Sequence, residues 1–391
     1  QNLHDEFIEN TISNFYLPFA VAPNFLINDK YYTIPMAIEE SSVVAAASKS
    51  AKFWAKHGGF KTTILGVEKV GQIHFFYNGP FKKIKSFFKK ISSDIINDLK
   101  PITSNMEKRG GGITSMEIID MNKKIHCYYQ IFVKFNTIDS MGANFINSCL
   151  EKITEIFKFY IEEKKFLDSV SEKIDFVMSI LSNFTPNCIA KASVNCKVKD
   201  LKKNNELNDT KFVENFISAV KISKVDTFRA VTHNKGIMNG IDSVVIATGN
   251  DFRSVEAGIH AYASRKGIYS GLSNAYIKDD SFYFDLIIPI SIGTVGGLTK
   301  LHPLVNWAHN LLGNPSATQL MQIIAASGLA QNFAAVKSLV TTGIQKGHMK
   351  MHLVNILNQL GADLIQKNKA IKYFKTNPVT YNNVREFLNK K

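Results

Sequence analysis

Short runs of alternating apolar and polar residues fill the middle of the chain. Three of them, at residues 72–77, 116–119 and 127–135, have the two-residue period of β-strands. Two stretches, near 81–99 and 143–159, carry apolar residues at three- and four-residue spacings, which predicts amphipathic helices. Strands and helices that alternate over about 115 residues predict a compact α+β insertion.

The segments on either side of this insertion predict further strands and helices. Residues 34–55 indicate a strand, a polar turn whose serines cap the next helix, and a helix of small residues. A strand is expected at 280–288, followed by a glycine-rich turn at 291–297. Helical spacing continues toward the C-terminus at 317–326, 329–339 and 348–360. Glycines between these helices predict hinges, so we expect the last ~50 residues to form a mobile flap.

The most informative segment runs from Thr232 to Asp251. It places Lys235 among glycines, then a short apolar run at 243–247, then Asp251. We interpret it as a glycine-hinged loop that presents the lysine, followed by a strand that delivers the aspartate. A cation and a carboxylate held in this way suit carbonyl chemistry. A surface lysine and a helix-capping aspartate explain the same residues equally well.

The composition describes a globular chain with an excess of positive charge. Its 391 residues are enough for two domains or for one large elaborated domain. The net charge of +14 comes largely from lysines. It has three interpretations: a nucleic-acid platform, solvated helix faces, or attraction of a polyanionic ligand such as a nucleotide or coenzyme A. Arginine is scarce, which favours solvated helix faces over base recognition.

Other features narrow the class of protein. No apolar run is long enough to span a membrane. The four cysteines lack zinc-knuckle or C-x-x-C spacing, so a reducing compartment, the cytoplasm, is expected. The chain begins at Gln1, and we expect that an N-terminal segment is missing from it. His348 and His352 lie four residues apart without a third ligand, so no metal site is predicted.

Seven motifs together carry a family resemblance. The hexapeptide D-S-M-G-A-N at 139–144 follows a strand and opens a helix, which suits phosphate binding by helix amides, although it lacks the G-x-G-x-x-G pattern. The others are I-P-M-A-I-E-E at 34–40 with S-V-V-A-A-A-S at 42–48, T-H-N-K-G-I-M-N-G at 232–240, A-T-G-N-D at 247–251, G-T-V-G-G at 293–297, G-L-A-Q-N at 328–332 and G-I-Q-K-G-H-M at 343–349. From Glu9 to about Asn355, the chain resembles class II, bacterial-type 3-hydroxy-3-methylglutaryl-coenzyme A (HMG-CoA) reductases.

The resemblance implies an α+β fold with three parts. A large mixed helix/sheet substrate domain would comprise residues 1–67 and 183–340, with HMG-CoA binding and catalysis in the second stretch. A small ferredoxin-like α+β domain, inserted at 68–182, would bind the nicotinamide cofactor, and residues 341–391 would form a helical flap. The resemblance further implies a homodimer, or a higher oligomer built from it, with active sites at the subunit interface, and neither a membrane nor a nucleic acid as partner.

The family reaction reduces (S)-HMG-CoA to (R)-mevalonate and free coenzyme A by two hydride transfers from NAD(P)H, through mevaldyl-CoA and mevaldehyde. By resemblance, Lys235 would stabilise the developing oxyanion, and Glu40 would donate a proton to the reduced carbonyl oxygen. Asp251 would tune both groups by charge and hydrogen bonding. His348 would protonate the departing coenzyme A thiolate.

Binding residues follow from the same resemblance. Contacts to the acyl group fall on Ser42, Arg229 and Asn239, and the guanidinium of Arg229 suits the glutarate carboxylate. Contacts nearer coenzyme A fall on Gln331 and His352. The cofactor-binding positions are Asp139, Met141, Gly142, Ala143, Asn144 and Asn183.

Two departures from the family pattern change these expectations. Ser41 stands where the family usually has proline, which predicts a looser turn. Some NADH-using members carry an aspartate ahead of Gly110, where this chain has Thr103, followed by Lys108 and Arg109. Loss of that acid leaves room for a 2′-phosphate, so we favour NADPH over NADH, with no metal cofactor.

Two functions of other classes stay open at this point. One is a lysine-rich nucleic-acid binder that uses the α+β insertion as its platform. The other is an acyl-coenzyme A binding protein that keeps the fold without catalysis. The joint presence of Lys235, Glu40, Asp251 and His348 argues against the second.

Overall fold

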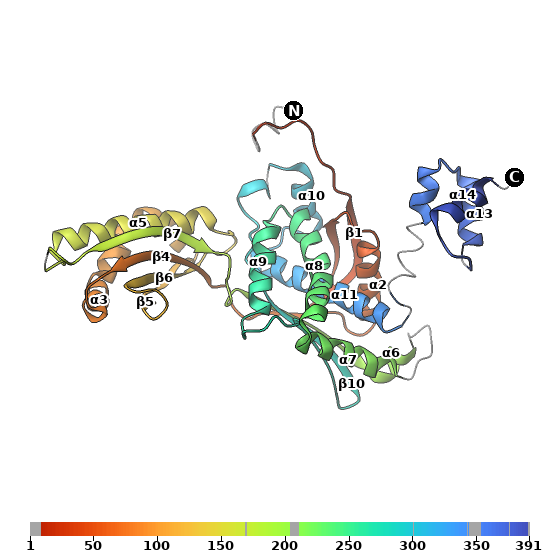
Figure 1. The fold of residues 1–391 in the computed structure, drawn as a ribbon, viewed down its shortest axis with the longest axis horizontal. Coiled ribbons are helices and arrows are strands. Elements are labelled where there is room, and N and C mark those ends of the chain that lie inside the picture. Colours follow the sequence, from red (N-terminus) through yellow and green to blue (C-terminus); the bar gives the residue numbers. More distant parts are fainter. Residues whose placement is uncertain are drawn as a thin grey trace.

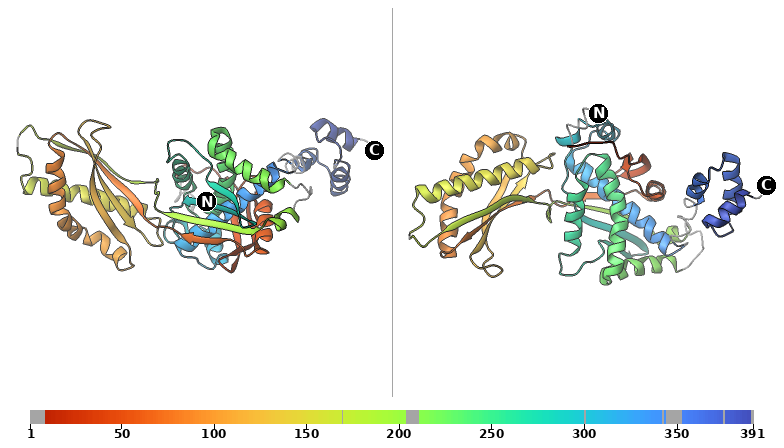
Figure 2. Two further views of the ribbon diagram at one scale, coloured as in Figure 1. Left: turned by 90° about the horizontal axis from the view of Figure 1, so that it is seen from below. Right: turned by 45° about the horizontal axis from the view of Figure 1, so that its top comes forward.

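A computed structural model gives the fold as three bodies in a row (Figure 1). The structure describes residues 9–168, 170–203, 211–299, 301–341, 343, 353–374 and 376–389. A helix-covered sheet lies at one end, a large body lies in the centre, and a small group of C-terminal helices lies at the other end (Figure 2). Each body has its own hydrophobic core. The mixture of helices and strands confirms the predicted α+β class.

The body at one end is built on a four-stranded antiparallel sheet in the order β5–β6–β4–β7. Its elements are β4 (Lys69–Tyr77), α3 (Phe81–Asp98), α4 (Lys100–Glu107), β5 (Gly112–Asp120), β6 (Tyr128–Asn136), α5 (Ala143–Glu163) and β7 (Ile174–Ser182). The core lies between α3, α5 and one face of the sheet, where Phe88 and Phe157 meet Ile73 and Phe75. Two long helices covering one face of this strand order form the ferredoxin-like β-α-β-β-α-β arrangement. The pattern of apolar residues predicted β4, β5, β6, α3 and α5, and missed α4 and β7.

The central body holds two antiparallel sheets and most of the remaining helices. The strands β1 (Phe19–Ile27) and β2 (Lys30–Ala37) pair with each other. The second sheet has the order β3–β8–β10–β9, with bounds β3 (Lys61–Ile64), β8 (Ile189–Lys197), β9 (Ser273–Lys278) and β10 (Ser281–Pro289). The helices are α2 (Val43–Ala55), α6 (Val198–Lys203), α7 (Phe212–Val225), α8 (Thr227–Ala247), α9 (Phe252–Ala263), η1 (Gly297–Thr299), α10 (Pro303–Leu311) and α11 (Ala317–Leu339).

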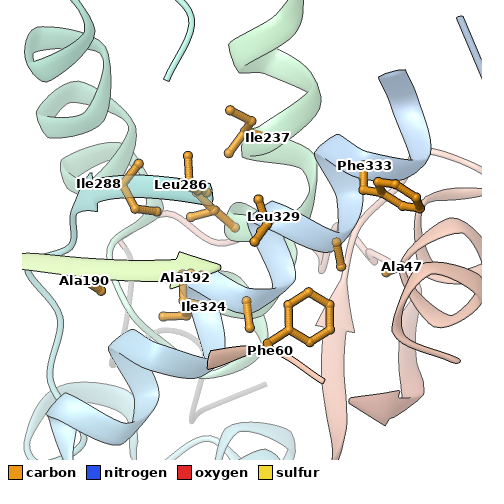
Figure 3. Packing of buried hydrophobic residues seen from close by; sticks show 14 of the residues in the cluster. Ala47, Phe60, Ala190, Ala192, Ile237, Leu286, Ile288, Ile324, Leu329 and Phe333 are labelled. Carbon is orange, nitrogen blue, oxygen red and sulfur yellow. The ribbon is translucent and has the colours of Figure 1, made fainter. Parts of the chain in front are cut away.

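Helices α8 and α11 run through the middle of this body and organise its core. Ile237 of α8 and Leu329 of α11 are fully buried beside Leu286 of β10 (Figure 3). Each such side chain contributes about 1.5–3 kcal/mol by leaving water. The two helices approach so closely that a Cβ atom on Gly240 would lie 2.6 Å from the carbonyl oxygen of Ser327.

One strand prediction and one prediction of a helix boundary in this body are wrong. Residues 243–247, expected as a strand, form the last turns of α8. The two helices expected at 317–326 and 329–339 are one continuous helix, α11, with Gly328 inside it. A short apolar run does not distinguish a buried strand from a buried helix. Gly328 allows close packing instead of ending the helix, since a Cβ there would lie 2.8 Å from Cγ1 of Ile241.

The C-terminal body consists of a helical stretch at 353–359, α13 (Leu364–Tyr373) and α14 (Tyr381–Asn389). Leu357, Phe374 and Val384 form its small core. The expected helix at 348–360 begins outside the described residues, so only its later part is seen. Among the helices that the structure describes, none is long and apolar enough to cross a bilayer.

Candidate functional site

Lys235 and Asn239 project from one face of α8 toward Glu40. They are four residues apart, which places them one above the other on a helix. The ammonium Nζ of Lys235 donates to Oε2 of Glu40, and Nδ2 of Asn239 donates to the same oxygen at 3.2 Å. The lysine side chain is 59% exposed and the glutamate 32%. One oxygen of Glu40 therefore accepts hydrogen bonds from both the Lys235 ammonium and the Asn239 amide, at a surface that a ligand can reach.

The glycines around Lys235 have a different purpose from the one predicted. Residues 232–240 are helical, so the expected glycine-hinged loop is wrong. Gly240 faces α11 and lets the two helices approach closely, as described above. Gly236 has more room, because a Cβ there would lie 3.7 Å from its nearest neighbour, Cβ of Ala335. A helix locked against α11 fixes the direction of the lysine more firmly than a hinged loop would.

Glu40 is positioned by the short segment between β2 and α2. The residue before α2, Ser42, has a φ of 74°, and its side chain makes no capping hydrogen bond. The predicted serine cap is therefore absent at this helix. A left-handed residue turns the chain sharply between strand and helix. The turn places Glu40 over α8.

A cavity of about 340 Å³ lies next to this cluster. Several predicted substrate residues line it, from three separate parts of the chain: Glu40, Ser42, Arg229, Lys235, Asn239 and Gln331. We call it the Lys235 pocket. Arg229 lies in the first turn of α8, where Asp226 caps the helix. The structure thus brings together these six predicted residues within one chain.

The Lys235 pocket also contains residues that the sequence did not single out. His233 is 1% exposed, and its Nε2 lies 2.7 Å from Oγ of Ser273, which lies 2.7 Å from Oδ1 of Asn332. Oδ1 only accepts, so Ser273 donates to Asn332 and His233 donates from Nε2. Burial, with Arg229 nearby, lowers the pKa of His233 to about 3, so the imidazole stays neutral. The spacing of His233 within T-H-N-K-G gave no signal of this chain of hydrogen bonds.

Asp251 lies outside the Lys235 pocket. It caps α9, accepting hydrogen bonds from the backbone N–H groups of Arg253 and Ser254. The helix from Lys235 to Ala247 alone spans about 18 Å at 1.5 Å per residue. Within one chain, the structure does not bring Asp251 to Lys235 and Glu40. The helix-capping interpretation of Asp251 is correct for the single chain.

Asp251 instead borders a second cavity of about 300 Å³. Its lining comes mainly from two turns, 140–145 and 293–297, and includes Met141, Gly142, Ala143 and Asn144. We call it the glycine-turn pocket. Gly142 precedes α5 with a φ of 89° and no side-chain cap, as the predicted turn before a helix requires. The first-turn amides of α5 consequently have no side-chain cap, which suits an anion.

Two predicted cofactor residues have structural partners at this pocket. The Oδ1 atom of Asp139 accepts from the backbone N–H of Ala317, 2.7 Å away, at the start of α11. The Oδ1 atom of Asn183 accepts from Oγ of Ser254, 2.9 Å away, on α9. Asp139, which precedes the pocket-lining Ser140, therefore ties the turn before α5 to α11, and Asn183 ties the segment after β7 to α9.

The positions relevant to cofactor choice lie at the end of α4. Thr103 is buried, whereas Lys108 and Arg109 are exposed. The loop after them packs against the start of the 137–142 turn, because a Cβ on Gly111 would lie 2.5 Å from the carbonyl oxygen of Asn136. Two exposed cations therefore lie on the loop that adjoins the start of the turn leading into α5.

His348 and His352 lie outside the described residues, so the structure does not place them. Among the residues that it does place, no group of three or more His, Cys, Asp or Glu side chains is arranged to hold a metal ion.

Comparison with known proteins places the chain in one family. Residues 1–353 match the family described as hydroxymethylglutaryl-coenzyme A reductase. The chain is 38% identical to the 3-hydroxy-3-methylglutaryl-coenzyme A reductase of Archaeoglobus fulgidus, over 92% of this chain and 78% of that protein. It is 34% identical to the probable reductase of Borreliella burgdorferi, over 92% and 80%.

Solved structures give the same result. The 3-hydroxy-3-methylglutaryl-coenzyme A reductase of Streptococcus pneumoniae aligns with a TM-score of 0.81 and 32% identity, over 99% of this chain and 90% of that chain. A class II reductase from the same organism, bound to NADPH in open conformations, aligns with a TM-score of 0.80 and 33% identity, over 87% and 89%. These matches support neither a nucleic-acid binder nor a non-catalytic acyl-coenzyme A binding protein.

Proposed function

Because the chain belongs to the hydroxymethylglutaryl-coenzyme A reductase family, we propose that Lys235, Glu40 and Asn239 form the centre of its HMG-CoA-reducing site. The chain is an NAD(P)H-dependent oxidoreductase of the mevalonate pathway. It reduces the thioester of HMG-CoA to the alcohol of mevalonate and releases coenzyme A. The observation that carries the site proposal is the shared oxygen of Glu40, which binds Lys235 and Asn239 at the edge of the Lys235 pocket.

Lys235 stabilises the negative charge that develops on the carbonyl oxygen. Its ammonium is aimed by a rigid helix and is partly exposed, so a substrate oxygen can replace Glu40 as its partner. A positioned cation in a pocket that excludes water stabilises an alkoxide more in the transition state than in the ground state. Asn239 donates from the next turn of the same helix face and holds the glutamate in place.

Glu40 donates the proton that converts the alkoxide to a hydroxyl. A carboxyl group beside Lys235 can deliver this proton to the oxygen that the ammonium stabilises. Asp251 interacts with Lys235 and Glu40 by charge and hydrogen bonding when it lies beside them. Arg229 and Ser42 bind the glutarate carboxylate end, and Gln331 lies toward coenzyme A.

The glycine-turn pocket receives the nicotinamide dinucleotide, which supplies the hydride for both reductions. The fit rests on the uncapped first-turn amides of α5 and on a lining of Met141, Gly142, Ala143 and Asn144, which lets a phosphate approach the backbone. Asp139 and Asn183 keep the rim of this pocket in place. The exposed cations Lys108 and Arg109 bind a 2′-phosphate, which favours NADPH over NADH.

Two chains are needed to complete one active site. Hydride transfer requires reacting atoms about 3–3.5 Å apart. In one chain, α8 separates the Lys235 pocket from Asp251 and the glycine-turn pocket. A homodimer in which each Lys235 pocket faces the Asp251 end of its partner removes this separation. The exposed apolar side chains of Phe228 and Val231, near the start of α8, support an interface there.

The remaining assignments concern the parts of the chain and its surroundings. Residues 68–182 form the cofactor domain, 1–67 and 183–340 the substrate domain, and 341–391 the flap. From that flap His348 protonates the coenzyme A thiolate and His352 contacts coenzyme A. The four cysteines are free, which supports a reducing compartment such as the cytoplasm.

An assay of the purified protein tests the function. We expect oxidation of NADPH, followed by its absorbance, that depends on HMG-CoA and yields mevalonate and a free thiol in equal amounts. Acetyl-coenzyme A serves as the control substrate and should support no oxidation, because it lacks the carboxylate that Arg229 binds. Absence of HMG-CoA-dependent oxidation with both NADPH and NADH would contradict the proposal.

A further inference from the structure

Lys69, the first residue of β4, is buried and yet fully hydrogen-bonded. It is 5% exposed. Its Nζ atom lies 2.7 Å from Oγ1 of Thr137, 2.6 Å from the carbonyl oxygen of Ser140, 3.0 Å from that of Met141 and 3.4 Å from that of Ile292. Lysines are rarely buried without a paired carboxylate. Here one hydroxyl and three backbone carbonyls take the place of the carboxylate.

The oxygens around Lys69 belong to the two turns that line the glycine-turn pocket. Thr137, Ser140 and Met141 form the turn between β6 and α5, and Ile292 immediately precedes the turn at 293–297. One ammonium therefore joins three segments that are far apart in sequence: β4, the turn before α5, and the end of the segment after β10.

Backbone contacts hold the same two turns together. The N–H of Thr294 donates to the carbonyl oxygen of Asp139 at 2.8 Å. Gly293 leaves no room for a side chain, because a Cβ there would collide with the backbone nitrogen of Met141. At this junction the carbonyls of Ser140 and Met141 thus accept hydrogen bonds from the buried ammonium of Lys69. The first residues of α5, which follow directly, line the pocket.

We propose that Lys69 is a positioning residue for the dinucleotide, which orients the 137–142 turn so that the first amides of α5 receive the cofactor phosphates. Without the ammonium, the carbonyls of Ser140 and Met141 would be buried without a partner or would turn toward the pocket. Carbonyl oxygens facing the pocket would repel phosphate. This inference rests on the proposed binding of NADPH in the glycine-turn pocket.

Burial opposes the charge that this arrangement needs. Burial lowers the pKa of Lys69 to about 8, and nearby Asp139 partly offsets the effect. An apolar side chain of similar length would avoid the cost of burying the charge, but it would leave the carbonyls of Ser140 and Met141 without their partner. The expected defect of such a variant is therefore in cofactor binding.

The test compares Lys69→Met with Lys134→Met. Lys134 is a half-buried lysine on β6 of the same sheet, and its ion-pair partner, Glu68 at 3.2 Å, lies outside both turns. We expect Lys69→Met to weaken NADPH binding, measured by cofactor fluorescence, about tenfold or more. Its KM for HMG-CoA should stay within about twofold of wild type, and Lys134→Met should bind NADPH normally.

Thr137→Val provides a second variant if Lys69→Met does not fold, which circular dichroism will show. It removes the hydroxyl that accepts from Lys69 and donates to Ser140 while keeping the side-chain volume. It should also weaken NADPH binding selectively. Normal NADPH affinity in the folded variants, or equal losses for NADPH and HMG-CoA, would overturn the role of Lys69. Failure of the wild-type protein to bind NADPH would overturn the proposed function as well.

Discussion

The two ends of α8 bear sites built from different parts of the chain. At the Lys235 pocket, side chains supply the chemistry: a lysine, a glutamate and an asparagine converge on one another, over a neutral wall that includes His233 and Asn332. At the glycine-turn pocket, backbone amides and carbonyls dominate, and the named side chains mostly fix the turns. In the proposed function, side chains of the first site carry out the chemistry, and the backbone of the second site binds the cofactor.

This difference explains which substitutions each site tolerates. A side-chain site fails when one functional group is removed. A backbone site fails when the turns shift, through an added Cβ at Gly293 or the loss of the ammonium of Lys69. The helix that aims Lys235 also keeps the two sites apart within one chain, and for this reason we propose that a second chain completes each active site.

The largest effect is expected from removal of the Lys235 ammonium. Lys235→Ala should lower kcat for HMG-CoA reduction by about a thousandfold, because the oxyanion loses its main electrostatic partner. Circular dichroism and thermal unfolding should match wild type, since the side chain is 59% exposed. Lys221→Ala, at an exposed position on α7, is the matched control. A loss of less than about tenfold would refute the oxyanion role.

Mixed dimers test whether one active site combines Lys235 of one chain with Asp251 of its partner. Lys235→Ala and Asp251→Ala should each be inactive alone. Co-expressed in equal amounts, they should regain about a quarter of wild-type activity, because half of the dimers are mixed and each mixed dimer keeps one intact site. Differently tagged chains allow the mixed dimer to be purified and assayed. A completely inactive mixed dimer would show that both residues serve the same chain's site.

Glycine substitutions on α8 test the close helix packing that supports both ends. Gly240→Ala should destabilise the protein by about 1–3 kcal/mol, because its Cβ would meet the backbone oxygen of Ser327. Gly236→Ala should stabilise it by up to about 1 kcal/mol, because alanine favours helix and the space is open. Urea unfolding gives both values. Equal effects of the two substitutions would contradict this explanation of the glycines.

The smallest expected effect concerns Asp242, on α8 between the two sites. Burial raises the pKa of its carboxyl, and a hydrogen bond with Glu256 of α9 raises it further. A raised folded-state pKa means that the native state binds more protons than the unfolded state, so stability falls as pH rises above about 4. Asp242→Asn removes that dependence.

Urea unfolding at several pH values measures this effect. We expect Asp242→Asn to equal wild type near pH 4 and to exceed its unfolding free energy by about 1–2 kcal/mol at pH 8. Asp175→Asn, at an exposed position on β7, should show no such trend. A difference between wild type and Asp242→Asn that does not vary with pH would contradict the raised pKa of Asp242.

The sequence alone determined the family and the α+β class, and it predicted most of the side chains that we propose for the reducing site. It predicted five residues that line the Lys235 pocket: Lys235, Glu40, Asn239, Arg229 and Gln331. Carbonyl reduction needs particular functional groups, and short sequence motifs point to them. The insertion was also predicted well, since its strands and helices each repeat with a simple period.

The tertiary structure alone decided how those residues are held. It made a helix of residues 243–247, because a buried apolar run has no period that distinguishes helix from strand. It gave the glycines of α8 a packing role, and it revealed His233 and Lys69, whose partners lie 40 to 223 residues away. It also separated Asp251 from Lys235. Local residue patterns encode which groups are present, whereas burial, helix contact and distance depend on segments that meet only after folding.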